Sequence, residues 1–259
     1  MKRPNILTVA LPWLLPALLL IVWALVTHRA LISARVLPAP GEVFAAAVRM
    51  ASTGELFRHI GVSAARAAAG FALGGSIGFA LGLLNGMSAR AARLLDSTLQ
   101  MIRNVPHLAL IPLFILWFGI DERAKLYLVA LGVFFPIYLN TYHGVRTVDA
   151  GLIEMGRVYG LTRGELFRHI IFPGSLPSIL VGVRFALGIT WLTLIVAETI
   201  AANSGIGYMT MNAREFLQTD VVALGILIYA LLGKLADLAT GWLEKRWLAW
   251  HPSFAVPGA

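Results

Sequence analysis

Long apolar runs alternate with short polar connections along this chain. No small-residue cleavage site follows the first run, so we interpret it as a retained helix and not as a signal peptide. The pattern predicts an all-α integral membrane protein, a bundle of six transmembrane helices. Six runs have about the length of 20 residues that a helix needs to cross a membrane: Leu11–His28, Ala64–Met87, Leu99–Phe118, Lys125–Tyr142, Pro177–Ala201 and Val221–Gly241.

The composition agrees with membrane insertion and narrows the chemistry. Hydrophobic residues make up 58% of the chain and charged residues 13%, against about 25% charged residues in soluble domains. There is no cysteine, and the six histidines form no metal-binding motif such as H-E-x-x-H. We therefore predict no disulfide, no metal site, no catalytic residues and no cofactor bound by this chain.

The net charge of +8 favours contact with an anionic membrane surface over nucleic acid, because basic residues commonly flank membrane spans on the cytoplasmic side. We predict a lipid bilayer as a partner and no nucleic acid. Six spans place both termini on one side, and more of the lysines and arginines fall on the side of Lys2 and Arg3. This bias predicts cytoplasmic N- and C-termini.

Five glycines of the second run recur at every fourth position. In a helix this spacing forms a ridge without side chains, which lets a neighbouring backbone approach closely. The ridge predicts either static close packing or a surface on which a neighbouring helix slides. It consists of Gly70, Gly74, Gly78, Gly82 and Gly86.

The polar stretch EMGRVYGLTRGELFRHIIFP, which begins at Glu154, interrupts the apolar pattern between the fourth and fifth runs. It predicts a first short helix that starts near Asp149 and ends at Gly160, since glycine commonly terminates helices. The apolar residues of this helix fall on one stripe: Leu152, Met155 and Tyr159.

A second short helix is predicted to start at the capping box Thr162–Glu165 and to stop before Pro173. Its apolar side chains also share one side: Leu166, Phe167, Ile170 and Ile171. Two capped amphipathic helices in one loop favour a docking surface for a soluble protein. A connector folded back onto the bundle is the alternative.

This loop resembles the cytoplasmic EAA loop of ATP-binding-cassette importer permeases. Four residues stand at the spacings of that motif: Glu154, Gly160, Ile170 and Pro173. Three positions depart from it in packing but not in charge: Met155, Gly156 and Phe172. The resemblance implies a coupling helix in a groove of a separate ATPase subunit, with these coupling residues: Glu154, Met155, Gly156, Tyr159, Gly160, Leu161 and Pro173.

Three further stretches look like the nitrate, sulfonate and taurine branch of these permeases, and most like permeases for aliphatic sulfonates: LPAPGEVF, RNVPHLALIPLFILWFGIDERAK and VAETIAANSGIGYMTMNAREFLQTD. The implied function is import of small alkanesulfonates into the cytoplasm by alternating access. Taurine, nitrate or another small solute is the alternative cargo.

The same resemblance implies a homodimer in the bacterial inner membrane, with two ATPase subunits and a periplasmic or lipid-tethered substrate-binding protein. The chain lacks a G-x-x-x-x-G-K-[ST] phosphate loop, so ATP and Mg²⁺ are expected on the partner ATPase. A secondary transporter with inverted repeats and a membrane-embedded enzyme with clustered carboxylates or histidines fit less well.

The implied domain organisation has three parts. Residues 1–62 form an N-terminal transmembrane helix and an external loop. Residues 63–241 form the core permease domain, with a cytoplasmic coupling loop at 143–176. Residues 242–259 form a cytoplasmic C-terminal tail.

Two ionisable residues lie in the fifth run, where charge is costly. Arg184 and Glu198 are separated by about 21 Å along an ideal helix, too far to pair. Arg184 can extend its side chain to the cytoplasmic interface. Glu198 either bonds Asn203 or Ser204, or pairs with an arginine of another helix, or acts as a gate at the outer mouth.

The third run carries Arg103, Asn104 and His107 around Pro106. The proline is predicted to break or kink the helix, because it lacks a backbone N–H. Either this polar cluster faces the translocation path, where Arg103 attracts an anion, or Arg103 lies at the cytoplasmic interface. Further along, NSGIGYMTMNAREF predicts a turn and a short helix that either receives the binding protein or caps the bundle.

Overall fold

The computed structural model describes residues 6–251, and within this range every regular element is a helix. Lys2 and Arg3, which enter the prediction of topology, lie outside the described residues. The elements are α1 (Ile6–His28), α2 (Pro40–Ser52), α3 (Glu55–Met87), α4 (Ala89–Arg103), η1 (His107–Leu110), α5 (Ile111–Phe118), α6 (Glu122–Arg146), α7 (Ala150–Val158), α8 (Arg163–Leu166), η2 (Phe167–Ile171), α9 (Phe172–Ala201), α10 (Ile206–Glu215) and α11 (Thr219–Trp247).

The helical membrane protein predicted from the apolar runs is confirmed, whereas the number of spans is confirmed only in part. Among the described residues, α3, α6, α11 and the continuous helix from Arg163 to Ala201 are long and apolar enough to cross a membrane. The bent pair of Ala89–Arg103 and His107–Phe118 makes a fifth span if it is counted as one. Since α1 contributes a shorter apolar stretch, Trp13–His28, the count of six stays a prediction.

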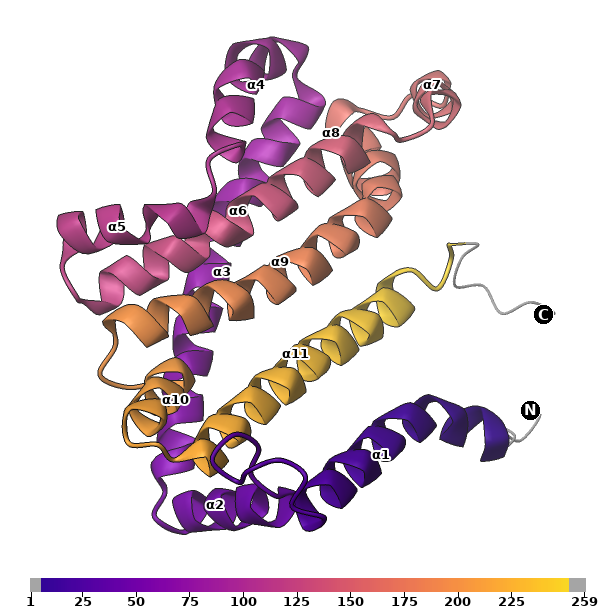
Figure 1. Cartoon of the computed structure of the whole chain (residues 1–259). Helices are drawn as coiled ribbons and strands as arrows, with labels where there is room; N and C mark the ends of the chain where they lie inside the picture. The colour runs from indigo at the N-terminus through magenta and orange to yellow at the C-terminus, as the bar shows by residue number, and fades with distance from the viewer. Residues whose placement is uncertain (1–5, 252–259) are drawn as a thin grey trace.

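The core of the bundle consists of three long helices, with α3 packed on α6 and α6 packed on α9. Figure 1 shows α4 and α7 at one end of this bundle and α2 and α10 at the opposite end. The helix α11 packs on α9, α10 and α2. The fold therefore has two ends of different construction, joined by long helices.

The glycine ridge of α3 lies against α6 along its whole length. A Cβ added at Gly78 would lie 2.5 Å from the carbonyl oxygen of Phe134, and a Cβ at Gly82 would lie 2.7 Å from the Thr141 side chain. The other three glycines are equally confined by residues of α6: Gly70 by Val129, Gly74 by Ala130 and Gly86 by Val145. Absence of side chains on this ridge is what lets the two backbones meet.

The break predicted at Pro106 is present. The helix α4 ends at Arg103, and the chain turns by 77° before it resumes as η1 and α5. Proline cannot donate the backbone hydrogen bond that would continue the helix. The third apolar run is therefore two short helices at an angle, not one straight span.

The predicted stop before Pro173 is wrong, because α8 continues through η2 into α9 as one helix of 39 residues. The residues before the proline form a π-helical segment, in which the N–H of Phe172 donates to the carbonyl oxygen of Phe167, five residues earlier. Pro173 follows directly after this segment, so the wider π-helical turn is where the continuous helix accommodates a residue without an N–H. The loop expected at residues 143–176 is thus helical from Arg163 onward.

Candidate functional site

The helix α7 is closed at both ends by local interactions. Asp149 precedes it, and its Oδ1 accepts a hydrogen bond of 2.7 Å from the N–H of Gly151. Gly160 follows with a φ of +79°, a left-handed conformation that glycine adopts without strain. These caps let a helix of nine residues stand apart from the bundle as a defined element.

One face of α7 packs inward through Gly156. A Cβ at this position would lie 2.6 Å from Ile170, 2.7 Å from Leu166 and 3.0 Å from Leu161. The departure from alanine in the EAA-like motif therefore has a structural reason, since the three apolar side chains fill the place of a methyl group. Gly156 and Leu161 belong to the internal contact of the loop.

Next to this contact, α7 carries an apolar and exposed surface. Leu152 and Met155, which the sequence placed on one stripe, are each about half exposed, and Tyr159 is 80% exposed. The most exposed of the group, Val158 at 86%, was not singled out from the sequence, although its spacing of three residues from Met155 places it on the same face. Glu154 is exposed beside this surface, Gly160 is exposed at its end, and Pro173 is half-buried in α9.

The capping box after α7 is confirmed. The backbone N–H of Thr162 donates to Glu165 Oε2 (2.8 Å), and the N–H of Glu165 donates to Thr162 Oγ1 (3.4 Å). These reciprocal bonds start the 39-residue helix directly behind the exposed face of α7. That helix is about 58 Å long at 1.5 Å per residue and ends at the other side of the bundle (Figure 1).

A buried ionic network lies at the far end of this long helix. Glu198 of α9 accepts from Arg66 Nη1 (2.7 Å), from Ser63 Oγ (2.8 Å) and from the N–H of Gly207 (2.9 Å). Tyr229 Oη of α11 lies 3.4 Å from Glu198 Oε2. The arginine of another helix is thus the partner of Glu198, and four helices (α3, α9, α10 and α11) meet at this carboxylate.

Arg66 joins a second carboxylate to the same network. Its Nη2 donates to Glu122 Oε1 (2.6 Å), and its Nε donates to Glu122 Oε2, so the contact is bidentate. Its Nη1 also donates to the carbonyl oxygen of Ser204 (2.6 Å), while Lys125 Nζ lies 3.1 Å from Glu122. Arg66 was not identified as a site residue from the sequence, although it is a lone charge within the second apolar run, as Glu198 is within the fifth.

Asn203, one of the alternative donors to Glu198 and a candidate path or gate residue, is exposed and makes no hydrogen bond with Glu198. The backbone amide of Gly207 donates in its place, because α10 starts at Ile206 directly over the carboxylate. This helix is the short one predicted from NSGIGYMTMNAREF. The other ionisable residue predicted in the fifth run, Arg184, pairs with Glu244 (2.8 Å) and Asp237 (3.3 Å) of α11.

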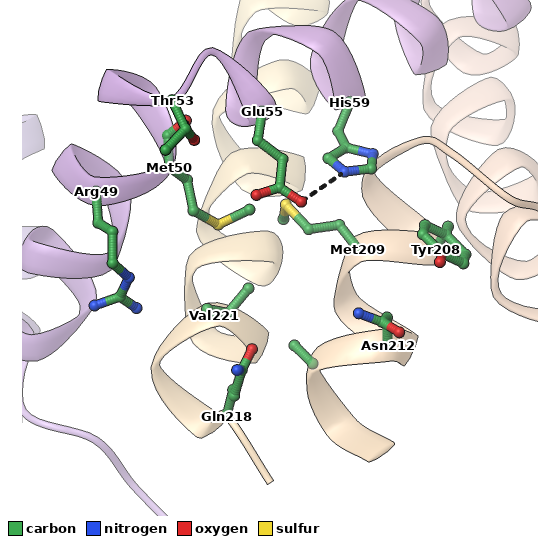
Figure 2. A pocket seen from close by; sticks show the side chains of 11 residues that line it. Arg49, Met50, Thr53, Glu55, His59, Tyr208, Met209, Asn212, Gln218 and Val221 are labelled. Carbon is green, nitrogen blue, oxygen red and sulfur yellow. Dashed lines mark hydrogen bonds and ion pairs between the residues drawn. The ribbon is translucent and has the colours of Figure 1, made fainter. Parts of the chain in front are cut away.

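A polar recess of about 300 Å³ lies close to this network, between α2, α3, α10 and α11. Figure 2 shows Glu55 and His59 of α3 turned toward each other at its edge, 3.6 Å apart, with Tyr208 and Asn212 of α10 beside them. The buried His59 accepts from the N–H of Gly205 through Nδ1 (3.0 Å). The neutral ring therefore carries its proton on Nε2, toward Glu55.

The polar residues around Pro106 separate in space. Arg103 and His107 line a common cavity of about 330 Å³ with residues of α6 and α9. Asn104 caps the C-terminus of α4, is exposed, and lines none of the cavities described here. Over residues 6–251 no group of three or more histidine and carboxylate side chains is placed to hold a metal ion.

A bundle of long apolar helices with a projecting capped helix at one end and a buried ionic network at the other defines an integral membrane transport subunit. The chain belongs to the family of binding-protein-dependent transport system inner membrane components, whose model matches residues 70–249. It is therefore a multi-pass permease of an ATP-binding-cassette importer, that is, a transport subunit.

Individual relatives cover nearly the whole chain. The SsuC protein of Escherichia coli, named for the transport of aliphatic sulfonates, is 59% identical over 96% of this chain and 94% of its own length. SsuC of Bacillus subtilis is 47% identical over 93% of this chain and 87% of its own length. The taurine transport system permease TauC of E. coli is more distant, at 36% identity over 91% of this chain and 87% of its own.

A solved structure supports the fold. The inward-facing MetNI methionine ABC transporter contains a chain that matches with a TM-score of 0.60 at 17% identity, covering 73% of this chain and 96% of that chain.

Proposed function

We propose that this chain is the permease subunit of an ATP-driven importer that moves small alkanesulfonates into the cytoplasm. The cargo is supported by the high identity to permeases named for aliphatic sulfonates, which exceeds that to a taurine permease by a wide margin. Taurine, nitrate or another small solute of this branch is the alternative cargo.

The observation that carries the mechanism is the exposed apolar face of α7, formed by Leu152, Met155, Val158 and Tyr159. On a capped helix outside the bundle, such a face is suited to a groove of a soluble partner, and we assign the ATPase subunit to it. Because the helix from Arg163 to Ala201 follows directly, movement of α7 reaches the Glu198 network through one rigid element.

The assembly in this proposal is a homodimer of the chain with two ATPase subunits and a periplasmic or lipid-tethered binding protein. ATP and Mg²⁺ are bound by the ATPases, whose closure moves the α7 helices and switches the path between inward- and outward-facing states. The α7 end then faces the cytoplasm, the side on which we also propose the N- and C-termini, and the end formed by α2 and α10 faces outward. The core permease domain spans residues 63–241, with residues 1–62 and 242–259 as its flanking parts.

The test is uptake of a labelled alkanesulfonate by cells that express this chain with its neighbouring subunits, against a strain that lacks the chain. Uptake is expected to depend on the chain and to vanish when the ATPase is inactivated. If an ATPase copurifies but no alkanesulfonate is taken up, the chain is still an importer permease but its cargo is a different solute. Taurine and nitrate would then be assayed. Uptake that persists without any ATPase would show that the chain acts as a secondary transporter and not as part of an ATP-driven importer.

A further inference from the structure

Two adjoining cavities lie beside the broken helix pair. The first, of about 330 Å³, is bounded by the break after α4 and by faces of α6 and α9. The second, of about 280 Å³, lies between α4 and α6. Both are lined by Arg103, Phe135 and Leu139. Arg103 therefore stands where the two cavities meet, and we call the first one the Arg103 cavity.

The guanidinium of Arg103 has no partner within the described part of the chain: no ion pair or hydrogen bond joins it to another of residues 6–251. This contrasts with Arg66 and Arg184, which both pair with carboxylates. An arginine has five N–H donors and keeps its charge in proteins. The side chain is thus free to bind an anion that enters either cavity.

Two further polar groups of the Arg103 cavity are held in place by their own hydrogen bonds. His107 Nε2 lies 2.9 Å from Thr193 Oγ1 of α9. Asn140 Nδ2 donates to the carbonyl oxygen of Pro136 (2.8 Å), which uses one of the two hydrogens of that amide. Gly132 leaves the space for the first contact, because a Cβ there would lie 3.2 Å from His107 Nε2.

The distribution of acidic groups favours an anion in the Arg103 cavity. None of its lining residues carries a carboxylate, whereas Asp96 lines the second cavity and accepts a hydrogen bond from Gln100 (3.1 Å). Like charges repel more strongly where water is partly excluded, so the Asp96 carboxylate disfavours an anion in the second cavity. An anion in contact with Arg103 is therefore more stable on the side away from Asp96.

The rest of the Arg103 cavity is apolar. Its wall includes Ile102, Leu131, Phe135, Phe185 and Ile189. An inorganic anion would leave this apolar wall exposed to water. An alkyl chain attached to the anionic group would cover the wall, and the removal of apolar surface from water would favour binding. The lining is thus amphipathic, with one cationic side chain at the edge of a hydrophobic surface.

We infer that the Arg103 cavity is a transit site for amphipathic anions, in which Arg103 binds the anionic head group and the apolar wall binds a short alkyl chain. This inference rests on the proposed function and adds to it the place where the cargo pauses inside the permease. It also makes the permease itself, and not the binding protein alone, selective for chain length.

The charge of the site is tested in proteoliposomes that hold the complete importer, with saturating binding protein loaded with hexanesulfonate. Arg103→Gln is expected to lower uptake per ATP hydrolysed by about tenfold, while the ATPase still copurifies and still hydrolyses ATP. Arg103→Lys keeps the charge and is expected to recover part of the uptake. Arg90→Gln is the matched control, since Arg90 is exposed on the same helix and lines neither cavity.

The apolar wall is tested with Phe185→Ala, because Phe185 is 63% exposed and its truncation leaves the bundle core intact. The ratio of hexanesulfonate to methanesulfonate uptake is expected to fall by about threefold. An unchanged ratio would overturn the assignment of the alkyl chain to this wall.

The outcomes separate the inference from the function on which it rests. Wild-type uptake together with equal transport by Arg103→Gln and Arg90→Gln would overturn the transit site and leave the proposed function in place. Absence of alkanesulfonate uptake by the wild-type importer would overturn the proposed cargo and the inference with it.

Discussion

Arg66 of α3 and Glu198 of α9 form a buried ion pair, with 2.7 Å between Nη1 and Oε1 and side-chain exposures of 6% and 0%. The carboxylate also accepts from Ser63 and from the backbone of Gly207, so the charge is surrounded by donors from two further positions. A carboxylate with this many bonds holds α3, α9 and α10 in one relative arrangement. The long helix that begins behind α7 therefore ends in a fixed joint.

Glu198→Gln removes the charge from this joint and keeps its shape. Loss of one partner of a buried pair costs about 3–5 kcal/mol in general, and we expect the lower end of this range, because Arg66 retains its bidentate contact with Glu122. The expected result is reduced uptake and a lower thermal unfolding temperature in detergent, at unchanged membrane levels.

The control for this variant is Glu215→Gln, because Glu215 is exposed at the end of α10. It is expected to leave uptake and unfolding temperature unchanged. Normal uptake by Glu198→Gln would show that the network has no part in transport.

Gly78→Ala tests the contact between α3 and α6. The new methyl group would lie 2.5 Å from the carbonyl oxygen of Phe134, which is backbone and cannot move aside without shifting α6. Overpacking of this kind costs about 1–3 kcal/mol, so a lower unfolding temperature and lower uptake are expected.

The matched variant is Gly61→Ala on the same helix, where nothing lies within 4 Å of the added Cβ. There the helix propensity of alanine is expected to stabilise the protein by up to about 1 kcal/mol. Equal unfolding temperatures of the two variants would contradict a close-packed ridge.

Tyr159→Asp places a charge on the exposed apolar face of α7. Since Tyr159 is 80% exposed, its replacement should not unfold the permease, whereas a buried aspartate in the ATPase interface would be costly to desolvate. We expect about a tenfold loss of copurified ATPase and a parallel loss of uptake. Phe216→Asp, on an exposed residue after α10 at the opposite end of the bundle, should retain the ATPase; retention of the ATPase by both variants would exclude α7 as the docking element.

Glu244→Gln tests the pair between α9 and α11 and is expected to have a small effect. Arg184 is 45% exposed at its side chain and keeps a second partner in Asp237, so the loss should stay below about 1 kcal/mol. Thermal unfolding of this variant beside Glu198→Gln compares a pair whose arginine is half-exposed with a pair in which both side chains are buried. A larger destabilisation by Glu244→Gln would mean that the α9–α11 contact, and not the Glu198 network, holds the long helix in place.

Most of the features that were predicted correctly depend on residues close together in the sequence. The apolar runs place α3, α6, α9 and α11, the break at Pro106 follows from a missing N–H, and the caps at Gly160 and Thr162 follow from local hydrogen bonds. Pro173 was the exception among local features. Its effect depends on the π-helical segment before it, and the propensities of single residues do not reveal that segment.

The sequence by itself determined that the protein is a helical membrane protein, because hydropathy, helix caps and the spacing of glycines depend on neighbours within a few turns. Only the tertiary structure decided which charges meet: it joined Arg66 to Glu198 across 132 positions, left Asn203 outside the network, and left Arg103 without a partner among residues 6–251 beside an apolar wall. The sequence shows that a charge within an apolar run needs a partner. Which residue is that partner depends on the packing of helices that are distant in sequence. The position of a charged residue on its own helix does not reveal which distant helix will pack against it.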